Sequence, residues 1–248
     1  IAPSNQQIIW VGTGEANIFR SSQSGAGVYK STDGGKTWQN MGLAGTQTIP
    51  RVIINPENPD IVYVAASGNE WTNNEERGVY KTTDGGKTWN KILYIDEKTG
   101  AIDLVMDPKD SNTLYAATWQ RMRKKWNYPR NEPDYTGSGI HKTTDGGKTW
   151  KPIDNGLPEA RYRGRIGIDL CQAKPNVLYA LVDNYEPARE PTKEERENIY
   201  GFPSAGIIKG ATVYRSDDKG ETWKQTSVLT PETKQRMESH SGTYGWVF

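Results

Sequence analysis

The stretch Ser31-Thr-Asp-Gly-Gly-Lys-Thr-Trp38 occurs four times in this chain, with small changes. The second and third copies, Thr82 to Trp89 and Thr143 to Trp150, read Thr-Thr-Asp-Gly-Gly-Lys-Thr-Trp. The fourth copy, Ser216 to Trp223, reads Ser-Asp-Asp-Lys-Gly-Glu-Thr-Trp. A hydroxyl residue, an Asp, a Gly, a Thr and a Trp keep the same offsets throughout. Such fixed spacing indicates a repeated structural unit, and the rest of the sequence is interpreted from it.

The repeated stretch has the composition of a tight hairpin between two β-strands. Each copy follows a short β-type run, at residues 28–30, 79–81, 140–142 and 213–215. Glycine supplies positive φ, and the Asp carboxylate can accept backbone N–H bonds inside the turn. The Trp then re-enters the sheet, so we expect four largely buried indoles. These are Trp38, Trp89, Trp150 and Trp223.

Two more strands precede each hairpin. Apolar runs with β-branched residues contain Trp10, Tyr63, Tyr115 and Tyr179 at equivalent positions, and further runs lie upstream at 51–54, 101–106 and 165–170. Apolar, aromatic and β-branched residues in short runs are typical of strands. Each unit is therefore four antiparallel strands, A to D, with the repeated hairpin between C and D. This pattern predicts an all-β protein, a β-propeller of about four blades.

The repeat also sets the domain organisation, a single propeller segment over residues 1–248. The expected blades cover about 1–43, 44–95, 96–155 and 156–229, and 230–248 leads into a further blade or closes the ring. The simplest interpretation is a segment of a longer propeller, and a closed four-blade ring is the alternative. In the first case the partners include the remaining blades of the same or an associated chain, because open strand edges need covering.

The pattern Ser/Thr-x-Asp-x-Gly-x-Thr-Trp resembles the Asp-box, or BNR repeat, of sialidases, sortilin-type receptors and xyloglucan-active glycoside hydrolases. The resemblance implies a propeller in which the box joins the two outer strands of a blade, away from the active site. It implies that the box carboxylates form turns and are not catalytic. These are Asp33, Asp84, Asp145 and Asp218. It also implies an extracytoplasmic protein, whether periplasmic, attached to the cell surface or secreted.

Composition excludes several classes of function. Lys and Arg number 31 and Asp and Glu 30, so no global field favours nucleic acid. The chain has one thiol, Cys171, and two imidazoles, His141 and His240, so we expect no metal and no cofactor. No stretch approaches the roughly 20 apolar residues of a membrane span.

The lengths of the B–C loops indicate which face of the propeller carries the functional residues. From the strand-B aromatic to the box Asp there are 30 residues in blade three (115 to 145) and 39 in blade four (179 to 218). The first two blades have 23 (10 to 33) and 21 (63 to 84). B–C loops emerge opposite the Asp-boxes, and variable loops on a fixed scaffold usually carry function.

The candidate ligand-binding residues lie in these loops. Blade three offers interleaved aromatic and cationic residues, which can stack on sugar rings and pair with carboxylates. The expected set is Trp119, Arg121, Arg123, Trp126 and Tyr128, with Trp71 of blade two and Tyr185 of blade four. The alternative is that Trp119 and Trp126 pack beneath their own loop.

Two functions follow. The sequence favours a binding or scaffolding module for a glycan or protein ligand. The alternative is a glycoside hydrolase that uses two carboxylates across a cleft, for which Glu15 and Asp183 are the candidates. The xyloglucan-active relatives carry a catalytic Asp near the first B–C loop, where this chain has Glu15. The arginine triad of sialidases has no full counterpart, although Arg51 and Arg165 begin strands A and face the expected channel.

Overall fold

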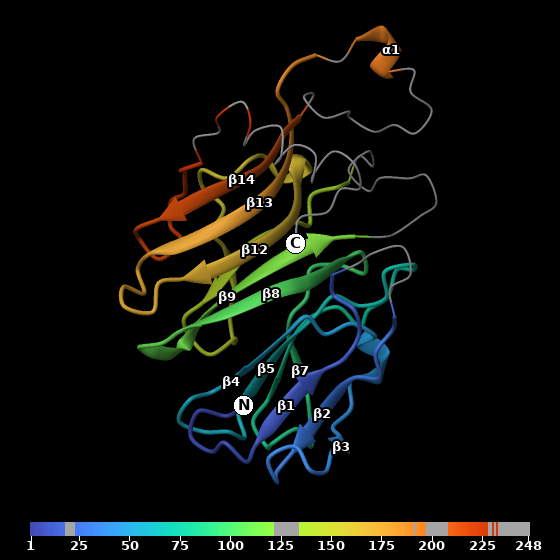
Figure 1. The fold of residues 1–248 in the computed structure, drawn as a ribbon, viewed down its shortest axis with the longest axis vertical. Helices are drawn as coiled ribbons and strands as arrows, with labels where there is room; N and C mark the ends of the chain where they lie inside the picture. Colours follow the sequence, from blue (N-terminus) through green and yellow to red (C-terminus); the bar gives the residue numbers. More distant parts are fainter. Residues whose placement is uncertain are drawn as a thin grey trace.

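The computed structural model describes residues 1–17, 23–121, 134–190, 192–196, 208–227, 230 and 232. These residues form four antiparallel sheets. In Figure 1 the sheets follow one another from β1–β3 at the bottom to β12–β14 at the top. The chain is therefore all-β with propeller-type blades, as its sequence predicts. No helix among these residues has the length and apolar character needed to cross a membrane.

The blades are consecutive in sequence, and each runs from an inner strand to an outer one. The first holds β1 (Ile9–Gly12), β2 (Val28–Ser31) and β3 (Gln39–Asn40). The second holds β4 (Arg51–Ile54), β5 (Val62–Ala66), β6 (Gly78–Thr82) and β7 (Asn90–Leu93). The third holds β8 (Thr99–Asp107), β9 (Asp110–Gln120), β10 (Gly139–Thr143) and β11 (Lys151–Pro152). The fourth holds β12 (Arg163–Leu170), β13 (Leu178–Pro187), β14 (Ile208–Ser216) and β15 (Lys224–Gln225).

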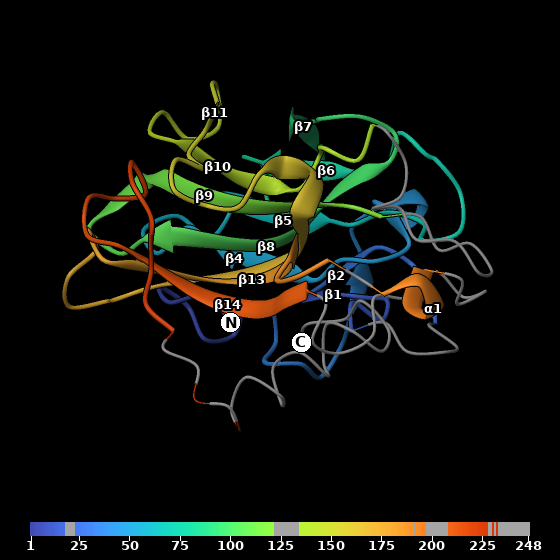
Figure 2. The ribbon, with the colours of Figure 1, turned by 90° about the horizontal axis from the view of Figure 1, so that it is seen from above.

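The helical segments of the described chain are short. They are the 3₁₀ turns η1 (Ala44–Thr46) and η3 (Ala160–Tyr162) and the helix α1 (Lys193–Arg196). The two views of Figure 1 and Figure 2 show α1 apart from the four sheets. The helical segments therefore contribute no wall to the site described below.

Each Asp-box closes the hairpin between the third and fourth strands of its blade with one set of hydrogen bonds. In the second blade, Thr88 donates its backbone N–H to Asp84 Oδ1 at 3.0 Å and its hydroxyl to Oδ2 at 2.6 Å. Thr82 donates its hydroxyl to Asp84 Oδ1 at 2.7 Å and accepts the N–H of Gly86 at 2.9 Å. These bonds to the carboxylate hold the pKa of Asp84 well below its usual range. The other three boxes repeat the arrangement, so all four carboxylates are committed to their own turns.

A lysine joins each blade to the box of the next one. Lys30 donates to the carbonyl of Gly85 at 3.2 Å, Lys81 to that of Gly146 at 2.8 Å, and Lys142 to that of Lys219 at 3.0 Å. Each ammonium also lies over the aromatic ring of the neighbouring second strand, that of Trp10, Tyr63 or Tyr115. We call this repeated contact the inter-blade joint.

In the last three boxes the Trp completes the joint from the other side. The indole N–H of Trp89 donates to Met41 O, and its ring meets that of Trp10 edge-on with centroids 6.0 Å apart. Trp223 likewise donates to Ile153 O at 2.7 Å and is 3% exposed. Trp89 and Trp150 are half-buried, and both pack against the core of the preceding blade.

The expectation of a buried Trp38 is wrong, because this indole is 44% exposed. Its box is the first in the chain, so no earlier blade among the described residues offers a surface for the ring. The indole N–H donates instead to Gly35 O within its own turn. At the opposite end Tyr179 is 41% exposed, whereas Tyr63 and Tyr115 are 1% and 0% exposed under the next box. Burial at these positions is decided by the neighbouring blade.

The inner strands of the last three blades lie next to one another. The strand β8 contacts both β4 and β12, and Figure 1 shows β8 and β12 side by side. Apolar residues between successive sheets form the core, in three clusters that follow the blade interfaces. Side chains on the inner strands β4, β8 and β12 that do not enter this core face the central axis around which the blades are arranged.

Candidate functional site

A cleft of about 360 Å³ opens on the inner strands of the last three blades. Its walls come from the starts of β4 and β12, from β8 and from the loop after β1. The lining residues are Ala16, Asn17, Pro50, Arg51, Ile102, Asp103, Arg165, Ile166 and Gly167. A volume in the usual range of ligand pockets, roughly 300–1,000 Å³, makes this the candidate binding cleft.

Asp103 is the hub of the cleft. Its Oδ1 accepts hydrogen bonds from Nε of Arg51 at 2.8 Å and from the backbone N–H of Leu104 at 2.9 Å, and Nη2 of Arg51 forms an ion pair with the same oxygen at 2.8 Å. Its Oδ2 accepts the backbone N–H of Ile168 from β12 at 3.0 Å. One buried carboxylate therefore ties three blades together through three hydrogen bonds and an ion pair.

Arg165 lies beside this hub without a carboxylate of its own. Its Nη2 donates to the side-chain oxygen of Asn17 at 2.9 Å, and the described residues hold no carboxylate within ion-pair distance of it. Burial lowers the pKa of Arg165, the charge of Asp103 raises it, and the charge of Arg51 lowers it further. The guanidinium is half-buried, and a neutral amide is its hydrogen-bond partner.

Of the two candidate catalytic carboxylates, Glu15 is exposed and Asp183 is buried. Glu15 precedes the cleft residues Ala16 and Asn17, and its Oε2 accepts the N–H of Gln23 at 3.3 Å. Asp183 is 0% exposed within β13 and accepts the hydroxyl of Tyr185 at 2.5 Å. The structure therefore does not bring the two carboxylates to one open surface.

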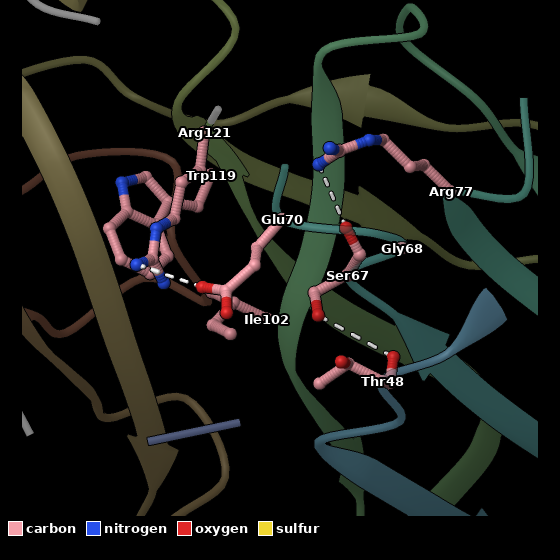
Figure 3. Close-up of a pocket in the computed structure, with 8 residues that line it drawn as sticks. All are labelled: Thr48, Ser67, Gly68, Glu70, Arg77, Ile102, Trp119 and Arg121. Atoms are coloured by element: carbon pink, nitrogen blue, oxygen red, sulfur yellow. Dashed lines mark hydrogen bonds and ion pairs between the residues drawn. The ribbon is translucent and has the colours of Figure 1, made fainter. Parts of the chain in front are cut away.

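A second, very small pocket lies between blades two and three (Figure 3), where Glu70 and Arg121 meet. Arg121 Nη2 lies 3.2 Å from Glu70 Oε2, with both side chains only 10% exposed. The guanidinium also covers the ring of Trp119 at 4.6 Å. Arg77 spans the base of the blade-two loop by donating to the carbonyls of Ser67 at 2.8 Å and Asn69 at 2.5 Å. The pocket holds about 10 Å³ and is a packed junction.

Several expected ligand-binding residues are therefore inside the protein. Trp119, placed in a loop by the sequence, lies in β9 opposite Gly100, because pairing with β8 extends that strand. Trp119, Arg121 and Tyr185 are each 8% exposed, so a ligand would have to displace their packing to reach them. Trp71 is 48% exposed on the blade-two loop. Arg123, Trp126 and Tyr128 lie outside the described residues.

The sequence signals part of the cleft. Arg51 and Arg165 both begin inner strands, which suggests that they face the axis. Asp103 goes unnoticed as a site residue because it lies inside the apolar run Ala101-Ile-Asp-Leu-Val-Met106. A charged residue in a buried strand is itself the signal, since such groups are rarely buried unless paired. In the described part of the chain, no three His, Cys, Asp or Glu side chains gather in a metal-binding arrangement.

Comparison with known proteins agrees with this class of fold, the Asp-box propeller. The model of the Sortilin-Vps10 family, described as sortilin, neurotensin receptor 3, matches residues 26–201. The chain belongs to this family.

Several of the curated relatives are xyloglucanases. Xyloglucanase Xgh74A of Acetivibrio thermocellus is 26% identical over 187 residues, which cover 71% of this chain and 19% of the relative. An oligoxyloglucan-reducing end-specific xyloglucanase of Emericella nidulans is 24% identical over 222 residues, covering 78% of this chain and 26% of that protein. The chain thus spans about a fifth to a quarter of these relatives.

Solved structures share the fold. The GH74 enzyme of Niastella koreensis superposes with a TM-score of 0.58 at 22% identity, covering 91% of this chain and 28% of that one. The GH74 xyloglucanase of Xanthomonas campestris gives a TM-score of 0.59 at 17% identity, covering 92% and 29%.

Proposed function

We propose that the chain is the glycan-binding part of a glycoside hydrolase-type propeller and that the cleft around Asp103 holds a stretch of polysaccharide. The observation that carries the proposal is the open, polar cleft on the inner strands, beside the B–C loops. Relatives named as xyloglucanases, which align with 71% and 78% of the chain, support a β-glucan of the xyloglucan type as ligand. A polysaccharide ligand also supports a location outside the cytoplasm.

These relatives favour the hydrolase alternative over the simple binding module that the sequence alone favours. Hydrolysis of a glycoside commonly needs two carboxylates, about 5–10 Å apart, on either side of the bond. Solvent reaches Glu15, whereas Asp183 is buried and Asp103 is occupied by Arg51. We therefore assign Glu15 as the carboxylate that this chain can contribute, with its partner outside the described residues.

The test blocks the cleft without disturbing the fold. A Cβ built at Gly167 meets no atom within 4 Å, so a Gly167→Phe side chain has room to enter the cleft. We expect the parent chain to bind a xyloglucan heptasaccharide in a calorimetric titration, and the Gly167→Phe chain to melt normally and bind none. If the parent fails to bind, or the variant binds equally well, the proposal is wrong.

A peptide ligand is the second candidate, since the matching family is described by the name of a receptor. The same titration distinguishes it. Binding of peptides in place of glycans, with equal sensitivity to Gly167→Phe, would assign the cleft to a protein ligand.

A further inference from the structure

The charges that line the cleft do not cancel. Arg51, Asp103 and Arg165 come from three neighbouring inner strands, β4, β8 and β12, so two guanidinium groups share one carboxylate. Glu15 does not line the cleft, and its carboxylate accepts the backbone N–H of Gln23 in the loop. Among the described residues, the lining therefore has a surplus of one positive charge.

Asp103 makes no ion pair with Arg165, because its carboxylate is held by other groups. Both of its oxygens already accept bonds, from Arg51 and Leu104 on one side and from Ile168 on the other. Rotating the carboxylate toward Arg165 would break bonds that connect three blades. Arg51, by contrast, is paired through two nitrogens to the same Asp103 oxygen.

Arg165 is thus the cation that gains most from an added anion. Its partner among the described residues is the neutral amide oxygen of Asn17. A hydrogen bond between two charged groups is roughly twice as strong as a neutral one, and an arginine fork matches a carboxylate with two parallel bonds. A carboxylate here would restore neutrality in a partly desolvated position, where charges interact more strongly than in water.

We propose that the cleft binds a polysaccharide stretch that carries an acidic sugar, a uronate whose carboxylate pairs with Arg165, more tightly than a neutral stretch of the same chain. The open space over Gly167 leaves room for the sugar ring next to that guanidinium. The assignment of this carboxylate to a sugar rests on the proposed glycan function. The assignment of the ligand as an anion rests only on the surplus positive charge of the cleft lining.

The experiment compares two ligands that differ at one carboxyl group, which is charged in the first and neutral in the second. One is a tetrasaccharide carrying a single glucuronate, and the other is the same tetrasaccharide as its methyl ester. We expect the acid to bind about tenfold more tightly or better, the scale of one charged hydrogen bond. Arg165→Met should remove this preference, so that the acid and the ester bind the variant equally well. Arg161→Met, a change at an exposed arginine on η3, should leave both affinities unchanged.

A salt titration of the parent covers the case in which Arg165→Met fails to fold. The preference for the acid should shrink as ionic strength rises, because screening weakens the charge contact and not the ring contacts. Equal binding of acid and ester would contradict the proposed preference for a uronate but would be consistent with the proposed glycan function. Binding of neither sugar, with Arg165-dependent binding of a tetrapeptide bearing a free C-terminal carboxylate, would overturn both.

Discussion

The indole nitrogen of Trp89 lies 2.8 Å from the carbonyl oxygen of Met41, so the second Asp-box is fastened to the blade before it. The same contact joins Trp223 to Ile153 at 2.7 Å. Lysines make the reverse contact, from the earlier blade to the later box. The Asp-box therefore closes its own hairpin and also connects neighbouring blades, and these two roles can be separated by mutation.

Trp223→Ala and Trp38→Ala should differ sharply in stability, although the two residues hold the same place in the repeat. Trp223 is 3% exposed, and truncating a buried aromatic costs about 3–5 kcal/mol. Trp38 is 44% exposed, and a surface change of this kind stays within about 1 kcal/mol. Urea unfolding of the two variants and the parent measures the difference. Equal losses would mean that the indole stabilises its own turn and not the joint.

Gly86→Ala and Gly35→Ala isolate the close approach of a box to the preceding blade. Both glycines have nearly the same φ, +92° and +90°, so the backbone strain of an alanine is the same at each. A Cβ at Gly86 would lie 2.6 Å from Trp10 Cη2, whereas at Gly35 the nearest atom is 3.6 Å away. We expect Gly86→Ala to lose about 1–3 kcal/mol more than Gly35→Ala, the usual range for overpacking. Similar unfolding midpoints would contradict the tight contact.

His141 should make stability depend on pH. Burial lowers its pKa from 6.5 to about 4, with a smaller upward effect of Asp154 and a downward one of Arg163. Between these values the unfolded chain binds a proton that the folded chain does not. Stability is therefore full above pH 6.5 and falls as the pH drops toward 4.

The measurement is the urea midpoint of parent and His141→Gln proteins between pH 7 and 4. Carboxylates titrate in both proteins, so the difference between the two curves reports the histidine. We expect the parent to lose more stability than the variant across this range. Parallel curves would show that His141 has an ordinary pKa in the folded protein.

The ion pair of Glu70 and Arg121 should be strongly coupled. With both side chains 10% exposed, removing one partner leaves a buried charge and costs about 3–5 kcal/mol. Glu70→Gln, Arg121→Met and the double variant form a double-mutant cycle. We expect the double variant to lose less unfolding free energy than the two single variants lose together. Glu159 and Arg161, whose side chains are 71% and 62% exposed, provide the control pair, with a coupling below about 1 kcal/mol. If the coupling between Glu70 and Arg121 were as small as that of the control pair, the Glu70–Arg121 ion pair would be screened by water and not buried.

The blades were predictable because their turns depend on local chemistry. Glycines with positive φ and a carboxylate two residues after a hydroxyl define each box, and both are visible in the sequence. The exposure of Trp38 was not predictable from the repeat, because the four boxes are nearly identical and the preceding blade decides the burial of each Trp. Local patterns describe a hairpin and say nothing about what covers it.

The site was harder to predict for the same reason. The strands β9 and β13 extend through Trp119 and Asp183 because they pair with long neighbours, so positions expected in loops are buried. The cleft combines residues from three strands and one loop, and Asn17 and Arg165 are 148 positions apart. Only their order around the axis brings them together, and that order follows from the packing of whole blades.

The inter-blade joint also bears on how such a chain can change during evolution. Each of the first three blades offers a lysine and an aromatic ring on one side, and the fourth offers Arg215 and Tyr179 there. A box tryptophan lies on the other side of a blade, and both sides recognise mainly backbone carbonyls and rings. A tandem duplication of one unit would therefore present matching surfaces to both of its neighbours without any compensating substitution. Gain or loss of whole units is then the easiest route to a propeller of different circumference, and the axial charges change with each unit added.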